Sequence, residues 1–222
     1  MADHLEDDEQ VEALKRWWDE NGKSTMVAIA LAVAGTVGWQ QYQGWTVSQA
    51  EQASEMWESM QQVLTTGSPG AEQDARAMAL ILKEDFGGST YAQFAAMRLA
   101  ALDVGAGELD AAEAELRWAL AKAGPQTELG QLVQLRLARV LAAQENEAAA
   151  LAILESGGNA YPAAYAMARG DIHMAAGRDQ QALDAYREAR AALLALGNPP
   201  GILDIKINSL ESRLAAGDEA AS

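Results

Sequence analysis

The sequence predicts an all-α protein in which one membrane-spanning helix near the amino terminus precedes an array of helical hairpins. Three observations lead to this fold class. Hydrophobic residues make up 50% of the 222 residues but Phe, Trp and Tyr only 6%, which favours Ala-rich packed helices over strands. A long uncharged run follows the first 23 residues, and similar stretches recur later at spacings typical of helix-turn-helix repeats.

The charge of the chain excludes several classes of partner and site. It has 16 basic and 32 acidic residues, a net charge of −16 and a pI near 4.4, so the phosphates of DNA or RNA would be repelled. There is no cysteine, which excludes structural disulfides, thiolate metal sites and a cysteine nucleophile. We therefore expect no nucleic-acid partner and no cysteine chemistry.

Residues 1–23 form an acidic tail with eight acidic and three basic residues. Apolar residues recur in it at three- and four-residue spacing, on one face of a predicted helix: Val11, Leu14, Trp17 and Trp18. This helix is expected to end near Asn21 and Gly22, both of which are good C-terminal residues. Two interpretations stay open: the apolar face lies on a membrane surface, or the helix simply leads into the next segment.

Residues 24–45 are predicted to form a transmembrane anchor. The run from Thr25 to Trp45 contains no charge, and its 21 residues would reach about 32 Å as a helix, close to the hydrocarbon thickness of a bilayer. Aromatic residues that favour the headgroup region lie on both sides: Trp17, Trp18, Trp39, Tyr42 and Trp45. A cleaved signal peptide with a small-residue site at 32–34 is the alternative, but the preceding acidic stretch is atypical of one.

Basic residues predict the orientation of this anchor. Lys15, Arg16 and Lys23 precede the span, whereas no Lys or Arg occurs from Ser24 to Ala75. Positive charge favours the cytoplasmic side of a span, so the amino terminus should be cytoplasmic. In a Gram-negative bacterium, residues 46–222 would then lie in the periplasm.

A stripe of small residues marks one side of the predicted span. Ala30, Ala34 and Gly38 fall four residues apart, so they share one face of a helix and would let another helix approach closely. This face is a candidate helix contact in the membrane. The alternative is that an Ala-rich anchor contains such a stripe by chance.

The rest of the chain contains internal repeats. Three similar stretches begin at Gly107, Gln144 and Gly177, at spacings of 37 and 33 residues. Each places a small residue and then a bulkier apolar one on the second helix of a hairpin: Ala112 and Leu116, Ala149 and Ile153, Ala182 and Tyr186. The preceding helices offer Ala100, Leu137 and Gly170 at the position where a small residue allows close packing, with Leu137 as the departure.

These stretches resemble tetratricopeptide repeats, with three copies from about Thr90 to Ala195. A divergent leading hairpin is predicted from a helix at 47–65, a turn at 67–70 and a helix at 71–85. A closing helix is predicted at 202–216, because the exposed ends of a repeat array must be covered. Residues 46–222 are therefore expected to form one repeat unit.

The first helices of such repeats line a concave face. The predicted register places these residues there: Phe94, Met97, Ala101 and Val104; Gln131, Gln134, Ala138 and Leu141; Ala164, Met167, Asp171 and Met174. The candidate binding residues among them are Phe94, Met97, Val104, Leu141, Met167, Asp171 and Met174. Flexible Met side chains suit a surface that accepts varied apolar segments. If the register is off by one residue, or if the closing helix covers the groove, these positions are core instead.

No pattern in the sequence indicates catalysis or cofactor binding. His4 and His173 each lack a second ligand at metal-binding spacing. The chain has no Gly-rich phosphate loop, no nucleophile elbow and no dinucleotide fingerprint. We therefore expect a protein that is not an enzyme, with no catalytic, cofactor or metal site. The acidity of the repeat unit would favour basic clients, or would reflect a salt-adapted host.

The whole arrangement resembles the YfgM family, the membrane-anchored ancillary subunit of the bacterial Sec translocon. The resemblance is carried by the segment VEALKRWWDENGK at 11–23, by the anchor that ends in Gly38 and Trp39, and by the repeats. It implies a single-span inner-membrane protein whose periplasmic domain works beside SecYEG. Its implied partners are a membrane-anchored, prolyl-isomerase-like chaperone and emerging secretory polypeptides. A homo-oligomeric structural or regulatory repeat protein without clients is the alternative.

Overall fold

The computed structural model describes the backbone of residues 3–221 and the side chains of residue 12 and residues 15–216. All regular structure in this part of the chain is helical, which confirms the predicted all-α class. The helices are α1 (Asp3–Thr66), α2 (Ala71–Asp85), α3 (Thr90–Ala106), α4 (Leu109–Ala123), α5 (Glu128–Ala143), α6 (Glu147–Ser156), α7 (Pro162–Ala175), α8 (Asp179–Ala195) and α9 (Ile202–Ala221). The chain divides into two compact units, Met1–Gln52 and Ala53–Ser222, and α1 contributes to both.

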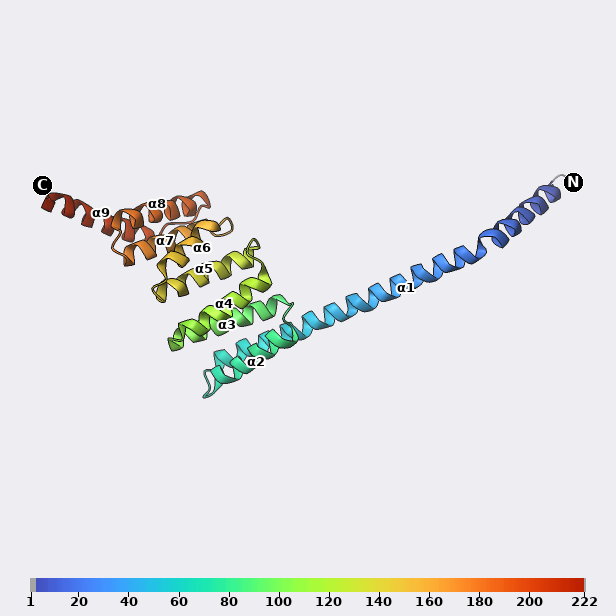
Figure 1. Cartoon of the computed structure of the whole chain (residues 1–222), viewed down its shortest axis with the longest axis horizontal. Helices are drawn as coiled ribbons and strands as arrows, with labels where there is room; N and C mark the ends of the chain where they lie inside the picture. The colour runs from blue at the N-terminus through green and yellow to red at the C-terminus, as the bar shows by residue number, and fades with distance from the viewer. Residues whose placement is uncertain (1–2, 222) are drawn as a thin grey trace. The chain divides into compact units, whose positions relative to one another are not determined.

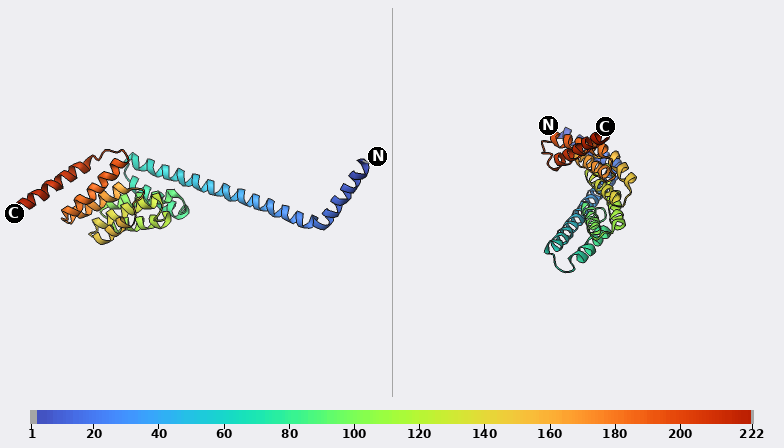
Figure 2. Two further views of the ribbon diagram at one scale, coloured as in Figure 1. Left: turned by 90° about the horizontal axis from the view of Figure 1, so that it is seen from above. Right: turned by 90° about the vertical axis from the view of Figure 1, so that its left-hand side faces the viewer.

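The expected break at the end of the acidic tail is absent, since α1 continues through Asn21 and Gly22. The Asn21 amide donates to the carbonyl of Trp17 (3.1 Å), and the Ser24 hydroxyl donates to the carbonyl of Asn21 (2.8 Å). Such bonds to the preceding turn are compatible with a continuous helix and often accompany bending. Figure 2 shows a bend in the blue part of α1. The predicted helix end was therefore wrong. Of the predicted apolar face, the side chains of Val11 and Leu14 lie outside the described residues.

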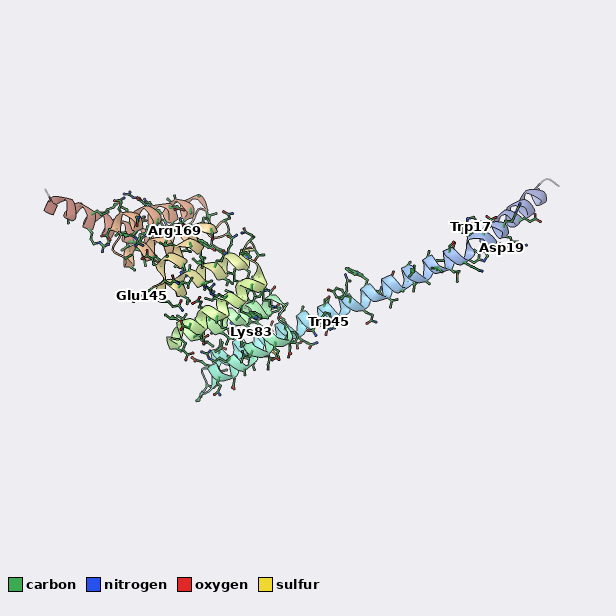
Figure 3. The ribbon with its side chains drawn as sticks, in the orientation of Figure 1. Trp17, Asp19, Trp45, Lys83, Glu145 and Arg169 are labelled. Carbon is green, nitrogen blue, oxygen red and sulfur yellow. The ribbon has the colours of Figure 1, made fainter. Side chains whose placement is uncertain are left out.

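The apolar part of α1 exposes its side chains within the first unit. Among the described residues, α1 supplies the one helix that is long and apolar enough to cross a membrane. Its aliphatic side chains between Met26 and Val37 are exposed, and so are the rings of Trp39, Tyr42 and Trp45. Consecutive centroids of these three rings lie 6.2 and 6.4 Å apart; Trp17 and Trp45 are labelled in Figure 3. Such a surface is unfavourable in water and suits a lipid environment.

The second unit is a stack of helical hairpins (Figure 1). The end of α1 packs with α2, and the pairs α3–α4, α5–α6 and α7–α8 follow before α9 closes the series. The right-hand view of Figure 2 shows these hairpins arranged along an arc. Three apolar clusters hold them together: one joins α1, α2 and α3, one runs from α3 to α7, and one joins α7, α8 and α9.

Local chemistry places several helix starts in this unit. Ser89 and Thr127 precede α3 and α5, and each hydroxyl accepts a hydrogen bond from a free amide of the first turn, from Ala92 (3.2 Å) and Gly130 (2.9 Å). Helix α7 begins at Pro162, a residue suited to the first turn because it lacks an amide hydrogen. The predicted turn at 67–70, the helix at 71–85 and the start of the closing helix at Ile202 are confirmed. The helix predicted at 47–65 is the end of the longer α1.

The turn inside the middle repeat lies one residue later than predicted. Gly107 and Gly177 have left-handed φ values of 79° and 71°, and the equivalent residue is Glu145, with φ 63° (Figure 3). At each turn the following amide donates to the carbonyl five residues earlier: Glu108 to Asp103 (2.8 Å), Asn146 to Leu141 (2.9 Å) and Arg178 to His173 (2.9 Å). The choice of Gln144 as the turn residue was therefore wrong, because a non-glycine residue adopts the left-handed conformation here.

The shifted register makes the three repeats more alike. The small and bulky residues of the second helices are Ala112 and Leu116, Ala150 and Leu154, and Ala182 and Tyr186, all fully buried. The small residues of the first helices are Ala100, Ala138 and Gly170, so Leu137 is no departure. Ala149 and Ile153 are only partly buried, which corrects their predicted roles.

Gly170 shows why this position must be small. A Cβ atom added to it would lie 2.5 Å from two ring carbons of Tyr186. That distance is far below any van der Waals contact, so only glycine lets α7 approach α8 around this ring. The Tyr186 hydroxyl donates to Asp171 (2.7 Å) and thereby ties the two helices together.

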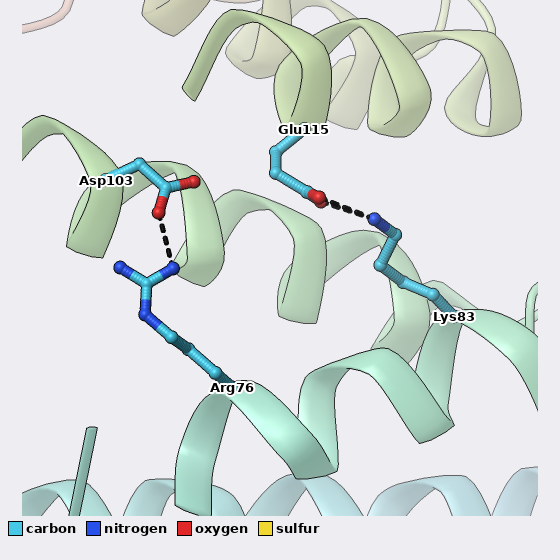
Figure 4. Close-up of polar contacts among 4 residues, drawn as sticks. All are labelled: Arg76, Lys83, Asp103 and Glu115. Carbon is cyan, nitrogen blue, oxygen red and sulfur yellow. Dashed lines mark hydrogen bonds and ion pairs between the residues drawn. The ribbon is translucent and has the colours of Figure 1, made fainter. Parts of the chain in front are cut away.

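Two ion pairs join the leading hairpin to the first repeat (Figure 4). Arg76 of α2 pairs with Asp103 of α3, whose side chain is only 4% exposed. Lys83 of α2 pairs with Glu115 of α4 at 2.6 Å, and its ammonium also lies 5.0 Å from the ring centroid of Trp118. The hydrogen bond to Asp103 raises the pKa of Arg76 above its ordinary value. Both pairs are partly buried and satisfied by their partners.

Candidate interaction groove

Two adjoining hollows lie among the first hairpins of the repeat unit. The first has a volume of about 320 Å³, and residues of α3, α4 and α5 line it, including Met97, Ala101, Val104, Leu109, Leu116, Arg136, Arg139 and Val140. The second has a volume of about 260 Å³, and residues of α1, α3 and α5 line it, including Trp57, Gln61, Phe94, Met97, Arg98, Leu132 and Arg136. Because the hollows share Met97, Ala101 and Arg136, we treat them as one α3–α5 groove. All of these residues belong to the repeat unit.

Three of the predicted concave-face residues line this groove. Phe94 packs against Trp57, with ring centroids 5.8 Å apart, and forms one wall of the second hollow. Met97 is almost buried between the two hollows, whereas Val104 is exposed at the end of the first. The structure thus brings these three together on one apolar surface, and their role in binding stays a prediction.

The middle repeat contributes different residues from those predicted. Leu141 is 2% exposed and belongs to the core, as the corrected register requires. Gln131 is also buried, and its side-chain oxygen accepts from the amide of Ala160 (2.8 Å). Its carbonyl accepts from the hydroxyl of Tyr165 (2.7 Å), a ring whose burial raises the pKa of that hydroxyl to about 12. The groove residues of α5 are instead Leu132, Arg136 and Arg139.

The closing helix covers the corresponding face of the third repeat. Met167 packs against the cluster that includes Leu203 and Leu210 of α9. Asp171 pairs with Lys206 of α9, whose ammonium lies 4.9 Å from the ring centroid of Tyr186. Met174 is partly exposed near the end of α7 and lines neither hollow. Met167 and Asp171 therefore hold α9 in place, as the covered-groove alternative describes.

The basic residues of the repeat unit fall into two groups. Three of the 16 basic residues and eight of the 32 acidic residues precede Ser24, which leaves 13 and 24 after it. Nine of these 13 form ion pairs within the described part of the chain: Arg76, Lys83, Arg117, Arg169, Arg178, Arg187, Arg190, Lys206 and Arg213. Lys122 lies over the ring of Trp118 at 5.7 Å. The remaining three, Arg98, Arg136 and Arg139, all line the α3–α5 groove.

The polar groups of the groove are incompletely satisfied within the described residues. The Nε of Arg98 and the Oε1 of Gln61 are buried and have no hydrogen-bond partner there, and both residues line the second hollow. Arg136 and Arg139 are exposed, and desolvation together with the nearby charge of Arg139 lowers the pKa of Arg136 below its ordinary value. Buried polar atoms and adjacent like charges are unfavourable unless a partner compensates them.

Sequence patterns did not indicate that the three groove arginines would lack ion-pair partners. None of them has an Asp or Glu three or four residues away on its own helix. The same holds for Lys83 and Arg169, which nevertheless find partners on other helices. Trp57 and Gln61 were missed because the leading hairpin was given no repeat register.

Other predicted features have simpler structural roles. The ring of His173 accepts a hydrogen bond at Nδ1 from Arg178 (3.0 Å), and burial together with Arg178 lowers its pKa. Within the described residues no three His, Asp or Glu side chains come together as a metal site. Ala30, Ala34 and Gly38 lie on the exposed surface of α1, and a Cβ added to Gly38 would meet nothing within 4 Å.

Comparisons with known proteins agree with this architecture. A family model described as a tetratricopeptide repeat-like domain matches residues 15–212. A relative from Escherichia coli, named ancillary SecYEG translocon subunit, is 31% identical over 187 residues, which cover 84% of this chain and 88% of the relative. A relative of the same name from Neisseria gonorrhoeae is 28% identical over 95% of this chain and 100% of its own length.

A third relative with that name, from Haemophilus influenzae, is 30% identical over 86% of this chain and 91% of its own length. No solved structure matches the chain. The family model covers the apolar part of α1 as well as the repeats, and each of these relatives matches most of the sequence. The chain therefore belongs to the tetratricopeptide repeat-like family of ancillary SecYEG translocon subunits, which confirms the resemblance noted in its sequence.

Proposed function

We propose that this protein is a non-enzymatic, membrane-anchored scaffold or chaperone that works beside the Sec translocon. One observation carries the proposal: the family match extends over residues 15–212 and thus includes both the apolar helix and the repeats. Relatives that match 84 to 95% of this chain are named as subunits of the SecYEG translocon. A repeat array suits this role because it presents an extended surface to other polypeptides.

Residues 24–45 cross the inner membrane once in this proposal. The acidic tail 1–23 lies in the cytoplasm and the repeat unit 46–222 in the periplasm, as the distribution of basic residues favours. The exposed aliphatic side chains of α1 would then contact lipid, and the rings of Trp39, Tyr42 and Trp45 would lie in the periplasmic headgroup region.

The repeat unit binds a membrane-anchored, prolyl-isomerase-like chaperone and emerging secretory chains in this proposal. The α3–α5 groove supports the assignment, because it combines an apolar lining and exposed Val104 with polar atoms that have no partner in the described part of the chain. Ala30, Ala34 and Gly38 form the lateral helix contact in the membrane.

Topology is tested on spheroplasts that carry the full chain with a tag at each end. Added protease should remove the carboxy-terminal tag, while the tag next to residues 1–23 stays protected until the membrane is opened. The protein should also stay in the membrane during an alkaline carbonate wash. Protection of both ends, or release by carbonate, would contradict the single-span anchor.

Partner binding is tested by affinity capture of the full chain in mild detergent. The Sec channel and the membrane-anchored chaperone should both be recovered. Ala34→Leu should weaken this recovery if the small-residue stripe is a contact, whereas Ala32→Leu, on the opposite side of the helix, should leave it unchanged. Recovery of neither partner, together with stable self-association, would favour the homo-oligomeric alternative.

A further inference from the structure

We propose that the α3–α5 groove binds an acidic amphipathic segment of a partner polypeptide. The carboxylates of this segment contact Arg98, Arg136 and Arg139, and a large apolar side chain between them enters the hollow beside Met97. The proposal rests on the proposed binding role of the repeat unit and specifies its chemistry.

The argument begins with the uneven distribution of charge. The chain after residue 23 has 24 acidic and 13 basic residues, so carboxylate partners for arginine are plentiful. Nine basic residues pair with these carboxylates, yet within the described residues the three arginines that line the groove have no such partner. Their common position makes the groove a cationic site on an acidic domain. Such local charge selects an acidic partner, even though the net charge alone favours basic clients.

The environment of the arginines strengthens this argument. Arg98 has a buried Nε without a partner in the described residues, whereas Arg136 and Arg139 are exposed one turn apart on α5, where desolvation and the charge of Arg139 lower the pKa of Arg136. A bound carboxylate would pair with the partly exposed guanidinium of Arg98 and relieve the repulsion between Arg136 and Arg139. Planar guanidinium groups are well suited to this, because they hold carboxylates with two parallel hydrogen bonds.

The lining between the arginines requires an apolar anchor in the same segment. Met97, Leu116 and Val140 line the first hollow, and Trp57 and Phe94 form an aromatic wall in the second. A purely acidic peptide would leave the exposed Val104 and the partly exposed rings of Trp57 and Phe94 in contact with water. A segment that alternates carboxylates with a Leu or Phe therefore fits better.

The arrangement of the arginines also constrains the spacing of the carboxylates. Arg136 and Arg139 are one helical turn apart on α5, whereas Arg98 lies across the groove on α3. Carboxylates three or four residues apart on a partner helix have a similar separation, roughly 5 to 6 Å between their Cβ atoms. An amphipathic acidic helix is therefore the partner that this geometry favours.

The test measures peptide binding to the full-length protein in phosphatidylcholine nanodiscs. Fluorescein-labelled helical peptides carry one Leu-Phe pair flanked by Glu, Gln or Lys residues, and fluorescence anisotropy follows their binding. The Glu peptide should bind, with an affinity that falls as salt is added, and the Gln and Lys peptides should bind at least about tenfold more weakly.

Substitutions then locate the binding site. Arg136→Gln and Arg98→Gln should each weaken binding of the Glu peptide about tenfold, the equivalent of one charge-assisted hydrogen bond. Arg136→Glu should weaken binding of the Glu peptide more than Arg136→Gln does, because it adds a like charge beside the peptide carboxylates. Arg117→Gln is the matched control: this exposed residue of α4 lies outside the groove, so its loss should leave binding unchanged. Circular dichroism checks that each variant is folded.

Three outcomes would overturn the proposal. Equal binding of the Glu and Gln peptides would show that the groove recognises apolar segments alone. Tighter binding of the Lys peptide would show that net charge dominates. Self-association that the groove substitutions abolish, without peptide binding, would identify a second copy as the occupant. None of these outcomes depends on translocon capture, so failure here and failure of the proposed function can be told apart.

Discussion

Helices α3 and α7 occupy the same position in their repeats, yet their inner faces have different surroundings. Met97 of α3 lines an open groove, whereas the equivalent Met167 of α7 packs beneath α9. The next equivalent pair shows why: α3 has Ala101 where α7 has Asp171, and Asp171 binds Lys206 of the closing helix. The difference teaches that one repeat position either lines an open groove or packs in the core, depending on whether a further helix covers that face.

The charges of the two regions differ in the same way. Every Lys and Arg in the described parts of α7, α8 and α9 has a carboxylate partner. For example, Arg169 pairs with Glu188 and Arg187 pairs with Glu211. Arg98 on α3 and Arg136 and Arg139 on α5 have none within the described residues. The last hairpin is thus internally satisfied, whereas the first hairpins keep three arginines without a carboxylate partner among the described residues.

The largest effect is expected from weakening the contact of α9 with α7, because this contact distinguishes the covered face of α7 from the open face of α3. Leu210 is 1% exposed in the cluster that holds α9, so Leu210→Ala should lower the free energy of unfolding by about 3 kcal/mol. Ile205 on the same helix is 69% exposed, and Ile205→Ala should change stability little. Urea denaturation of both variants measures the difference. Equal effects would mean that α9 does not cover α7.

A second test concerns the close approach of α7 and α8. Gly170→Ala would place a Cβ 2.5 Å from the Tyr186 ring and should destabilise the protein by about 2 kcal/mol. Gly105→Ala on α3 is the matched control, because a Cβ there meets nothing within 4 Å and alanine favours the helix. Thermal denaturation should show a lower midpoint for the first variant and an unchanged or higher one for the second.

A third test asks whether Glu145 or Gln144 corresponds to the turn residues Gly107 and Gly177 of the other repeats. Glu145→Gly should stabilise the protein by about 1 kcal/mol, since glycine adopts the left-handed turn without the steric cost that glutamate incurs. Gln144→Gly should instead destabilise it slightly, because Gln144 has an ordinary φ of −82°. Chemical denaturation distinguishes the two, and the reverse order would restore Gln144 as the turn residue.

The smallest expected effect is a pH dependence in the last hairpin. The pKa of His173 is lowered in the folded state. As the pH falls, the unfolded chain therefore takes up this proton before the folded chain does, and the free energy of unfolding should decrease below a pH of about 6.5. Above that pH the contribution is constant. His173→Gln should flatten the decline of the thermal midpoint between pH of about 7 and 5.5. An identical slope in both proteins would show that protonation of His173 has no effect on folding.

Much of the fold follows from local patterns. The uncharged run, the turn at 67–70 and the break before Ile202 each depend on residues close together in sequence, and the corresponding structure agrees. The expected end at Asn21 and Gly22 failed because a helix-ending residue is only a local preference, and α1 continues through it. The predicted turn of the middle repeat was wrong because nothing in the sequence marks Glu145, a non-glycine residue, as one with a left-handed backbone conformation.

Less of the candidate site could be foreseen. Phe94, Met97 and Val104 were found by repeat register, but Leu141 was displaced into the core by the one-residue shift at Glu145. Arg136 and Arg139 received no attention, because an unpaired arginine and one that pairs with a distant helix have the same local sequence.

The sequence by itself determined that the chain is helical, that one apolar segment is long enough to span a membrane, and that hairpins repeat after it. These properties arise from composition and spacing along the chain. Only the tertiary structure decided which inner face is covered by α9, and which cations keep no carboxylate partner. Those properties depend on residues far apart in sequence: Asp171 meets Lys206 only when α9 folds back, and no acidic side chain of the described residues reaches Arg136.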